Sequence, residues 1–210
     1  MHTRTDLWPA IHAERAALAE DLATLDDAQW AAPSLCERWC VEEVVAHLTA
    51  AASTGTLRWI TSMLGARFDA DLHNARRLAE HRGATPAQTL ARFRAAVTDT
   101  RAPSGDTAAW LGEVLVHAQD VRRPLGLART PSVEAATAVA TFFASRDFAV
   151  PSKTAAAGLR LEATDGPFAH GDGPLVRGTT IALVMAMAGR VDSCADLDGP
   201  GVATMRARVA

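Results

Sequence analysis

A stretch of nine residues in the middle of the chain, Trp110–Ala118, is apolar except for one glutamate and one histidine. If this stretch is helical, Glu113 and His117 stand four residues apart and lie on one face. The residues around them are apolar on nearly every side, which is typical of a helix that other elements surround. The fold must therefore bury this helix, and the carboxylate of Glu113 needs a partner there.

The pair Glu113 and His117 has two interpretations. A divalent cation is the strongest partner for a buried carboxylate, and the two side chains together would form half of a metal site. Alternatively, they form a hydrogen bond with each other or lie on an edge of the helix that faces solvent. The spacing alone leaves both interpretations open.

Most of the first 150 residues have helical periodicity. Thr85 and Pro86 are typical of an N-cap followed by a first-turn proline. Helices of this length pack as an up-down bundle, whose interior can bring side chains from facing helices together. We therefore predict a mainly α protein with a four-helix up-down bundle over residues 1–150. Helices are expected at about residues 7–25, 41–64, from 86 onwards, 107–123 and 132–148, and four or five of them would form the bundle.

The pattern changes after Pro151. Residues 159–164 alternate with a period of two, and residues 168–178 are rich in turn formers, which predicts a short hairpin or meander. Helices are expected at about residues 179–189 and from Val202 onwards. We therefore predict a small C-terminal α+β unit over residues 151–210.

The expected helix from Val41 contains a second glutamate four residues before a histidine, Glu43 and His47. Glu43 stands at the third position of this helix, where a carboxylate accepts hydrogen bonds from exposed backbone amides. We assign Glu43 to capping rather than to metal binding. His47 lies about one turn further, on or beside the apolar face, and is a candidate ligand. A core histidine with an ordinary hydrogen-bond partner would give the same pattern.

Composition and charge argue against several classes of protein. The net charge of −3, the pI of about 6.1 and the scattered basic residues do not favour nucleic-acid binding. The longest apolar run, near residues 181–188, is too short to span a membrane, and the N-terminus lacks a signal-peptide pattern. We expect a cytoplasmic protein in which Cys36, Cys40 and Cys194 are reduced thiols, and we assign Cys36 and Cys40 to packing.

Three ordered motifs stand out. They are SLCERWCVEEVVAHL at 34–48, GEVLVHAQDVRRPLG at 112–126, and a C-terminal set of VRG at 176–178, GR at 189–190 and LDGPGV at 197–202. Together they resemble the mycothiol-dependent maleylpyruvate isomerase family, a branch of the DinB-like metal-binding helical bundles. The resemblance extends over nearly the whole chain.

The resemblance implies one divalent metal ion, usually zinc, bound by His47, Glu113 and His117. Three protein ligands leave a coordination position for water or for the sulfur of mycothiol, a low-molecular-weight thiol cofactor. The implied reaction is cis–trans isomerisation of a small diacid by reversible thiol addition, with Arg190 as the catalytic arginine that binds a substrate carboxylate. Arg177 is a second candidate, and a surface salt bridge or a helix-end cap is the alternative for both arginines.

Other functions fit the same site. The thiol could be transferred to an electrophilic small molecule, as in detoxification, a metal-bound water could serve hydrolysis, or the metal could bind a non-catalytic module. Two positions depart from the family pattern, Arg38 in place of a usual glycine and Cys40 in place of a serine or threonine cap. Neither is a ligand.

Three further residues near these motifs receive structural assignments. Asp120 can either contact His117 or pair with Arg123, and we favour the pairing with Arg123. Trp39 and Trp110 are expected to pack in the core or at an end of the bundle.

Overall fold

The protein is described by a computed structural model that covers residues 6–36, 39–67, 69–102 and 104–210. It is mainly helical with one small sheet, which confirms the predicted fold class. The chain forms two compact units, Met1–Arg129 and Thr130–Ala210, so the division falls before the boundary that we expected at residue 150.

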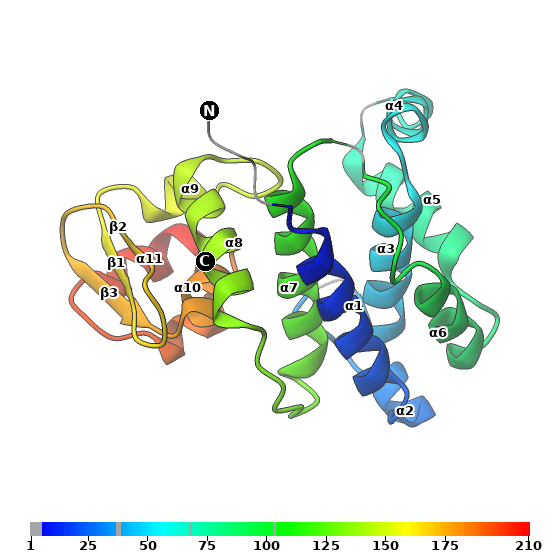
Figure 1. Ribbon diagram of the computed structural model, residues 1–210, viewed down its shortest axis with the longest axis horizontal. Helices are drawn as coiled ribbons and strands as arrows, with labels where there is room; N and C mark the ends of the chain where they lie inside the picture. The colour runs from blue at the N-terminus through cyan, green and yellow to red at the C-terminus, as the bar shows by residue number, and fades with distance from the viewer. Residues whose placement is uncertain (1–5, 37–38, 68, 103) are drawn as a thin grey trace. The chain divides into compact units, whose positions relative to one another are not determined.

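The first unit contains a bundle of four helices, α1 (Trp8–Leu22), α3 (Val41–Ser53), α6 (Pro86–Ala95) and α7 (Thr107–Arg122). Both α6 and α7 pack against α1 and against α3 (Figure 1). Apolar side chains from all four helices are buried between them, including Ile11, Leu18, Val44, Val45, Leu48, Phe93, Leu111 and Leu115. Their removal from water is the main term that stabilises such a core.

Local sequence explains where these helices begin. The hydroxyl of Thr85 accepts a hydrogen bond from the backbone N–H of Gln88, and Pro86 occupies the first turn of α6, as predicted. The helix α7 is buried along most of its length, which confirms that other elements surround it.

The segment expected to form one helix over residues 41–64 is two helices. Thr54 and Gly55 both have extended backbone conformations, and they separate α3 from α4 (Thr56–Gly65). A β-branched residue followed by glycine has weak helix propensity, which the periodicity of the apolar residues did not reveal. The structure also contains α2 (Asp27–Trp30) and α5 (Ala70–His81), which the sequence analysis did not predict, and both contact α3.

The second unit contains α8 (Val133–Ser145), α9 (Ser152–Ala156), α10 (Thr180–Met187), the 3₁₀ helix η1 (Val191–Asp196) and α11 (Val202–Val209). We expected α8 in the bundle, but it packs on α9 and α10 and therefore belongs to this unit. No helix among the described residues combines the length and the apolar character that crossing a membrane requires.

The sheet of the second unit has the strand order β2-β1-β3, with β1 at Arg160–Ala163, β2 at Ala169–His170 and β3 at Leu175–Gly178. The antiparallel pair β1 and β2 matches the expected hairpin, but β3 pairs with β1 in parallel instead of continuing a meander. Leu161 and Val176 are opposite each other in this parallel pair and are both fully buried. Their shared burial explains the register.

Candidate metal centre

The helices α3 and α7 bring together the three residues that the resemblance implies as ligands. His47 Nε2 lies 2.6 Å from Glu113 Oε1, and His117 Nε2 lies 3.7 Å from the same oxygen. One ligand atom from each residue lies within 4.8 Å of those of the other two. All three side chains keep some exposure to solvent, at 16%, 23% and 11% for His47, Glu113 and His117.

The antiparallel packing of α3 and α7 explains this convergence. Leu35, which precedes α3, donates a backbone hydrogen bond to the carbonyl oxygen of Asp120 near the end of α7. His47, further along α3, contacts Glu113, which comes earlier on α7. Side chains from the two helices therefore lie together, with the imidazoles of His47 and His117 next to the carboxylate of Glu113.

The contacts distinguish the two interpretations of the Glu113–His117 pair only in part. Glu113 forms its short contact with His47 on the other helix, whereas its distance to His117 exceeds that of a hydrogen bond. Glu113 and His117 are thus two members of a three-residue cluster with His47, and they are not hydrogen-bonded to each other through Nε2 and Oε1. Metal binding by the cluster stays a prediction.

Asp120 contacts the other ring nitrogen of His117. Its Oδ2 lies 2.9 Å from His117 Nδ1, and its side chain is completely buried. A carboxylate on Nδ1 fixes the tautomer and turns Nε2 towards the remaining ligands, an arrangement common in metal sites. This contact is the alternative that the sequence analysis ranked below a pairing with Arg123.

His117 also has a strongly perturbed acidity. Burial disfavours its charged form, but hydrogen bonds to Asp120 and Cys36 and the charges of Glu113 and Asp120 outweigh burial and raise the pKa from 6.5 to about 10. Without a metal, the imidazole therefore carries a proton on each ring nitrogen at neutral pH and is positively charged. Any cation that binds to a ring nitrogen must displace the proton there.

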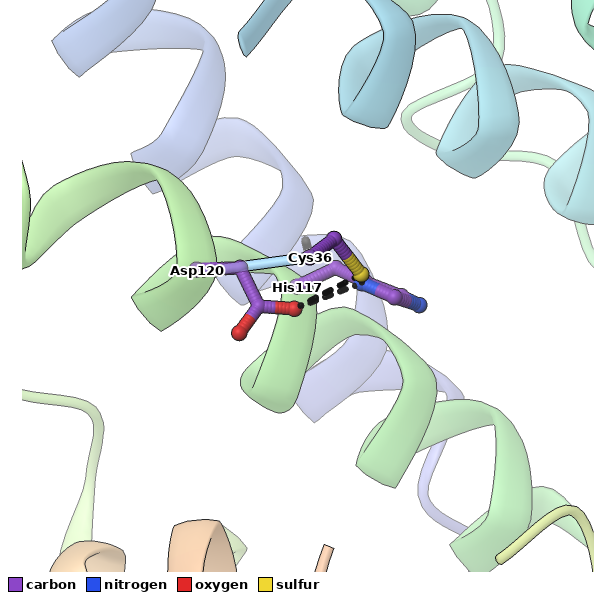
Figure 2. Close-up of side chains that lie close together, drawn as sticks. All are labelled: Cys36, His117 and Asp120. Atoms are coloured by element: carbon purple, nitrogen blue, oxygen red, sulfur yellow. Dashed lines mark hydrogen bonds and ion pairs between the residues drawn. The ribbon is translucent and has the colours of Figure 1, made fainter. Parts of the chain in front are cut away.

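The loop before α3 closes one side of the cluster. Ser34 Oγ donates a hydrogen bond to the carbonyl oxygen of Trp39, and an isolated β-bridge joins Pro33 to Cys40. The loop places Cys36 Sγ 3.5 Å from Asp120 Oδ2 and 3.7 Å from His117 Nδ1 (Figure 2). We had assigned Cys36 to packing alone, and Arg38 lies outside the described residues.

Trp39 also belongs to this site, although we expected it in the core or at a bundle end. Its ring centroid lies 4.7 Å from that of His47 and 6.3 Å from that of His117. The indole therefore covers one side of the two imidazoles and shields them in part from water. The residue pattern marks this position only in that Trp39 directly precedes Cys40, the N-cap residue of α3.

The predicted capping role of Glu43 is confirmed. The backbone N–H of Cys40, the N-cap residue of α3, donates to Glu43 Oε2 at 3.0 Å. Glu43 Oε1 also lies 3.5 Å from the Arg82 guanidinium. Cys40 is tolerated at the cap because the carboxylate at the third helical position satisfies its backbone N–H.

The two candidate arginines lie in the second unit. Arg190 precedes η1, and its Nη1 donates to the carbonyl oxygen of Ala188 at 2.8 Å. Arg177 lies on β3, and its backbone forms a bridge with Asp198. The contact of Arg190 with a carbonyl at the end of α10 is the capping alternative, and a role for either guanidinium in substrate binding stays a prediction.

Comparison with known proteins places the first unit in a family. Residues 11–111 match the family described as the mycothiol maleylpyruvate isomerase N-terminal domain. This part of the chain belongs to that family. His47 lies within the N-terminal domain as matched, and Glu113 and His117 follow its end by two and six residues.

The fold is also similar to that of two solved structures of the mycothiol-dependent maleylpyruvate isomerase. A histidine-to-alanine mutant of the mycothiol-dependent maleylpyruvate isomerase has a TM-score of 0.60 and 16% identity, over 92% of this chain and 91% of that chain. A second structure of the mycothiol-dependent maleylpyruvate isomerase has a TM-score of 0.57 and 17% identity, over 87% and 88% of the two chains. No curated protein matches the sequence.

The contact between Asp120 and His117 leads to a first prediction. Asp120→Asn keeps the shape of the side chain but replaces the charged acceptor by an amide, so the orientation and basicity of His117 change. We expect zinc affinity to fall by about 10–100-fold, measured by competition with a chelator. Asp106→Asn, at the start of α7, is the control and should bind zinc as wild type does. Equal affinities in both variants would show that Asp120 does not support the cluster.

Proposed function

We propose that this chain is a metal-dependent enzyme that uses a low-molecular-weight thiol, mycothiol, in chemistry of the maleylpyruvate isomerase type. The reaction is either cis–trans isomerisation of a small diacid or addition of the thiol to an electrophilic small molecule. The observation that supports this proposal is the convergence of His47, Glu113 and His117 from two helices. Membership of residues 11–111 in the N-terminal domain family supports the choice of thiol.

The donor atoms of the cluster fit a divalent cation. Two imidazole nitrogens and one carboxylate oxygen suit zinc, and they are also compatible with iron, nickel, cobalt or manganese. The ligand atoms already lie close together, so small side-chain movements would allow all three to reach one ion. Three protein ligands, the number in this cluster of described residues, are typical of catalytic zinc, whereas structural zinc normally has four.

The chemistry follows from this ligand set. A bound cation would hold the sulfur of a thiol as a thiolate near neutral pH, which removes the need for a separate base. His47, Glu113 and His117 would hold the cation, and Asp120 would keep His117 in the tautomer that presents Nε2. Trp39 would exclude water from the side of the imidazoles that it covers.

A diacid substrate requires cationic groups, and we retain Arg190 as the proposed carboxylate-binding residue on the basis of the sequence resemblance. A lysine cannot reproduce the two parallel hydrogen bonds of a guanidinium. Arg190→Lys should therefore raise KM for a diacid by roughly 10–100-fold, the loss expected for one hydrogen bond to a charged group. Steady-state kinetics with Arg160→Lys as the matched control, at an exposed position on β1 with no proposed role in binding, would measure this effect. An unchanged KM in Arg190→Lys would remove the residue from the proposed site.

The test of the function is direct. Protein loaded with zinc is incubated with mycothiol and maleylpyruvate, and formation of the trans isomer is followed by its ultraviolet absorption. A parallel reaction with mycothiol and an alkylating electrophile is analysed by mass spectrometry, because only transfer leaves a stable conjugate. Isomer without conjugate supports the isomerase, and conjugate without isomer supports the transferase. If neither product forms with zinc-loaded protein, the enzymatic proposal is wrong and a non-catalytic metal-binding module replaces it.

A further inference from the structure

His117 presents its two ring nitrogens to two different groups of potential ligands. Nε2 faces Glu113 and His47, whereas Nδ1 faces Asp120 and Cys36. Cys36, His117 and Asp120 form a second cluster whose ligand atoms all lie within 4.8 Å of one another. Figure 2 shows the sulfur, one carboxylate oxygen and one ring nitrogen of this second cluster next to each other.

The separations in the second cluster are close to those around a tetrahedral ion. Bond lengths of about 2.3 Å to sulfur and about 2.1 Å to nitrogen and oxygen place sulfur about 3.6 Å from each of the other two atoms. The observed distances are 3.7 Å from Cys36 Sγ to His117 Nδ1 and 3.5 Å from Sγ to Asp120 Oδ2. The same bond lengths put nitrogen and oxygen about 3.4 Å apart. The observed 2.9 Å is a hydrogen bond that a cation would open by roughly half an ångström.

We propose that Cys36, His117 and Asp120 form a second divalent-cation site, in which the His117 imidazole bridges two metal ions. The second ion takes the place of the proton between Nδ1 and Asp120, and its binding releases that proton and the proton of the Cys36 thiol. This inference goes beyond the proposed function and does not depend on its substrate.

The charges of the side chains balance two divalent cations. Glu113, Asp120 and the Cys36 thiolate each carry one negative charge, and a bridging imidazolate supplies the fourth. Four negative charges neutralise two divalent ions, which matters because Asp120 is completely buried and an unpaired buried charge is costly. Cys36 is only partly buried, so an ion can approach from its side.

The donor types select the kind of cation. Sulfur, imidazole nitrogen and carboxylate oxygen together suit zinc, cobalt or cadmium, whereas magnesium and calcium prefer oxygen ligands alone. A nucleophilic triad is a poorer description of the same residues. In such a triad the nucleophile and the acid contact opposite nitrogens of the histidine, whereas Cys36 and Asp120 both contact Nδ1.

Titration of the metal-free protein with cobalt(II) tests the proposal, because a cysteine ligand adds a sulfur-to-cobalt charge-transfer band in the near ultraviolet. Wild type should bind about two equivalents per chain and develop this band. Cys36→Ser should bind about one equivalent without the band. Cys40→Ser is the matched control, and it should behave as wild type because Cys40 lies outside both clusters.

Variants of the first cluster separate this inference from the proposed function. His47→Ala and Glu113→Gln should lose one equivalent of cobalt and keep the sulfur band. Suppose that wild type binds only one equivalent of cobalt, shows no sulfur band, and loses that equivalent in His47→Ala. This result would overturn the second site and leave the proposed function intact. A single equivalent whose band disappears in both Cys36→Ser and His47→Ala would also overturn it, because one ion would then take ligands from both clusters. Retention of the band in a protein without catalytic activity would support the second site while the proposed function fails.

Discussion

Glu113→Gln is expected to lower the affinity of the candidate metal centre for zinc by more than about 100-fold, the upper end of the loss for an outer partner of a ligand. Glu113 is the only acidic member of its cluster with His47 and His117. An amide keeps the volume but loses the negative charge that offsets the charge of the cation. Since the Glu113 side chain is part-exposed at 23%, this isosteric change should leave the fold intact.

The chain itself offers a matched control for this experiment. Glu43 also precedes a histidine, His47, by four residues, but its carboxylate caps α3. Glutamine is accepted at the same capping position, so Glu43→Gln should keep both the fold and the zinc affinity of wild type. The two variants are compared by competition with a chelator and by elemental analysis. Equal losses in both variants, or no loss in Glu113→Gln, would contradict the assignment of Glu113 as a ligand.

Arg122→Ala is expected to lower the free energy of unfolding of the first unit by about 3–5 kcal/mol. Arg122 is fully buried on α7, its Nε lies 2.8 Å from Asp21 Oδ2, and its Nη1 lies 4.0 Å from Glu14 Oε2. Both carboxylates belong to α1 and are almost buried. Removal of the guanidinium leaves them without their buried cation and opens a cavity between α1 and α7.

Urea unfolding followed by tryptophan fluorescence measures this effect, because all five tryptophans precede residue 130 and report on the first unit. Arg129→Ala is the matched control. Arg129 contacts the same Asp21 but is 41% exposed, so its removal should cost no more than about 1 kcal/mol. The double variant Asp21→Asn with Arg122→Met should recover part of the loss, since it removes the guanidinium together with the carboxylate that lies 2.8 Å from it. Similar stabilities of Arg122→Ala and Arg129→Ala would show that the buried pair contributes nothing.

Helical periodicity was sufficient to predict the parts of the fold that position the site. The apolar surroundings of Glu113 and His117 correctly indicated a buried helix, and Thr85 with Pro86 correctly marked the start of α6. Periodicity did not predict the break at Thr54 and Gly55, because the apolar residues continue through it. It also placed α8 in the bundle, since an amphipathic face does not specify which neighbour covers it.

The site itself could be predicted only where residues lie on regular helices. Spacing along α7 paired Glu113 with His117, and the apolar face of α3 marked His47 as a separate candidate, but only the family resemblance joined the three into one set. Position in the first turn identified Glu43 as a cap. The loop residues Cys36 and Trp39 were missed as members of the site. Their positions depend on loop contacts, such as the bond from Leu35 to Asp120, and loop contacts between distant segments have no periodic signature.

The most direct measurement is an anomalous difference map at the zinc absorption edge from crystals of zinc-loaded protein. The account predicts a peak at about 2.0–2.2 Å from His47 Nε2, His117 Nε2 and a Glu113 oxygen, with the remaining position taken by water or an added thiol. The absence of any peak between these three side chains with zinc in excess, or a fourth protein side chain bound to the same ion, would contradict it.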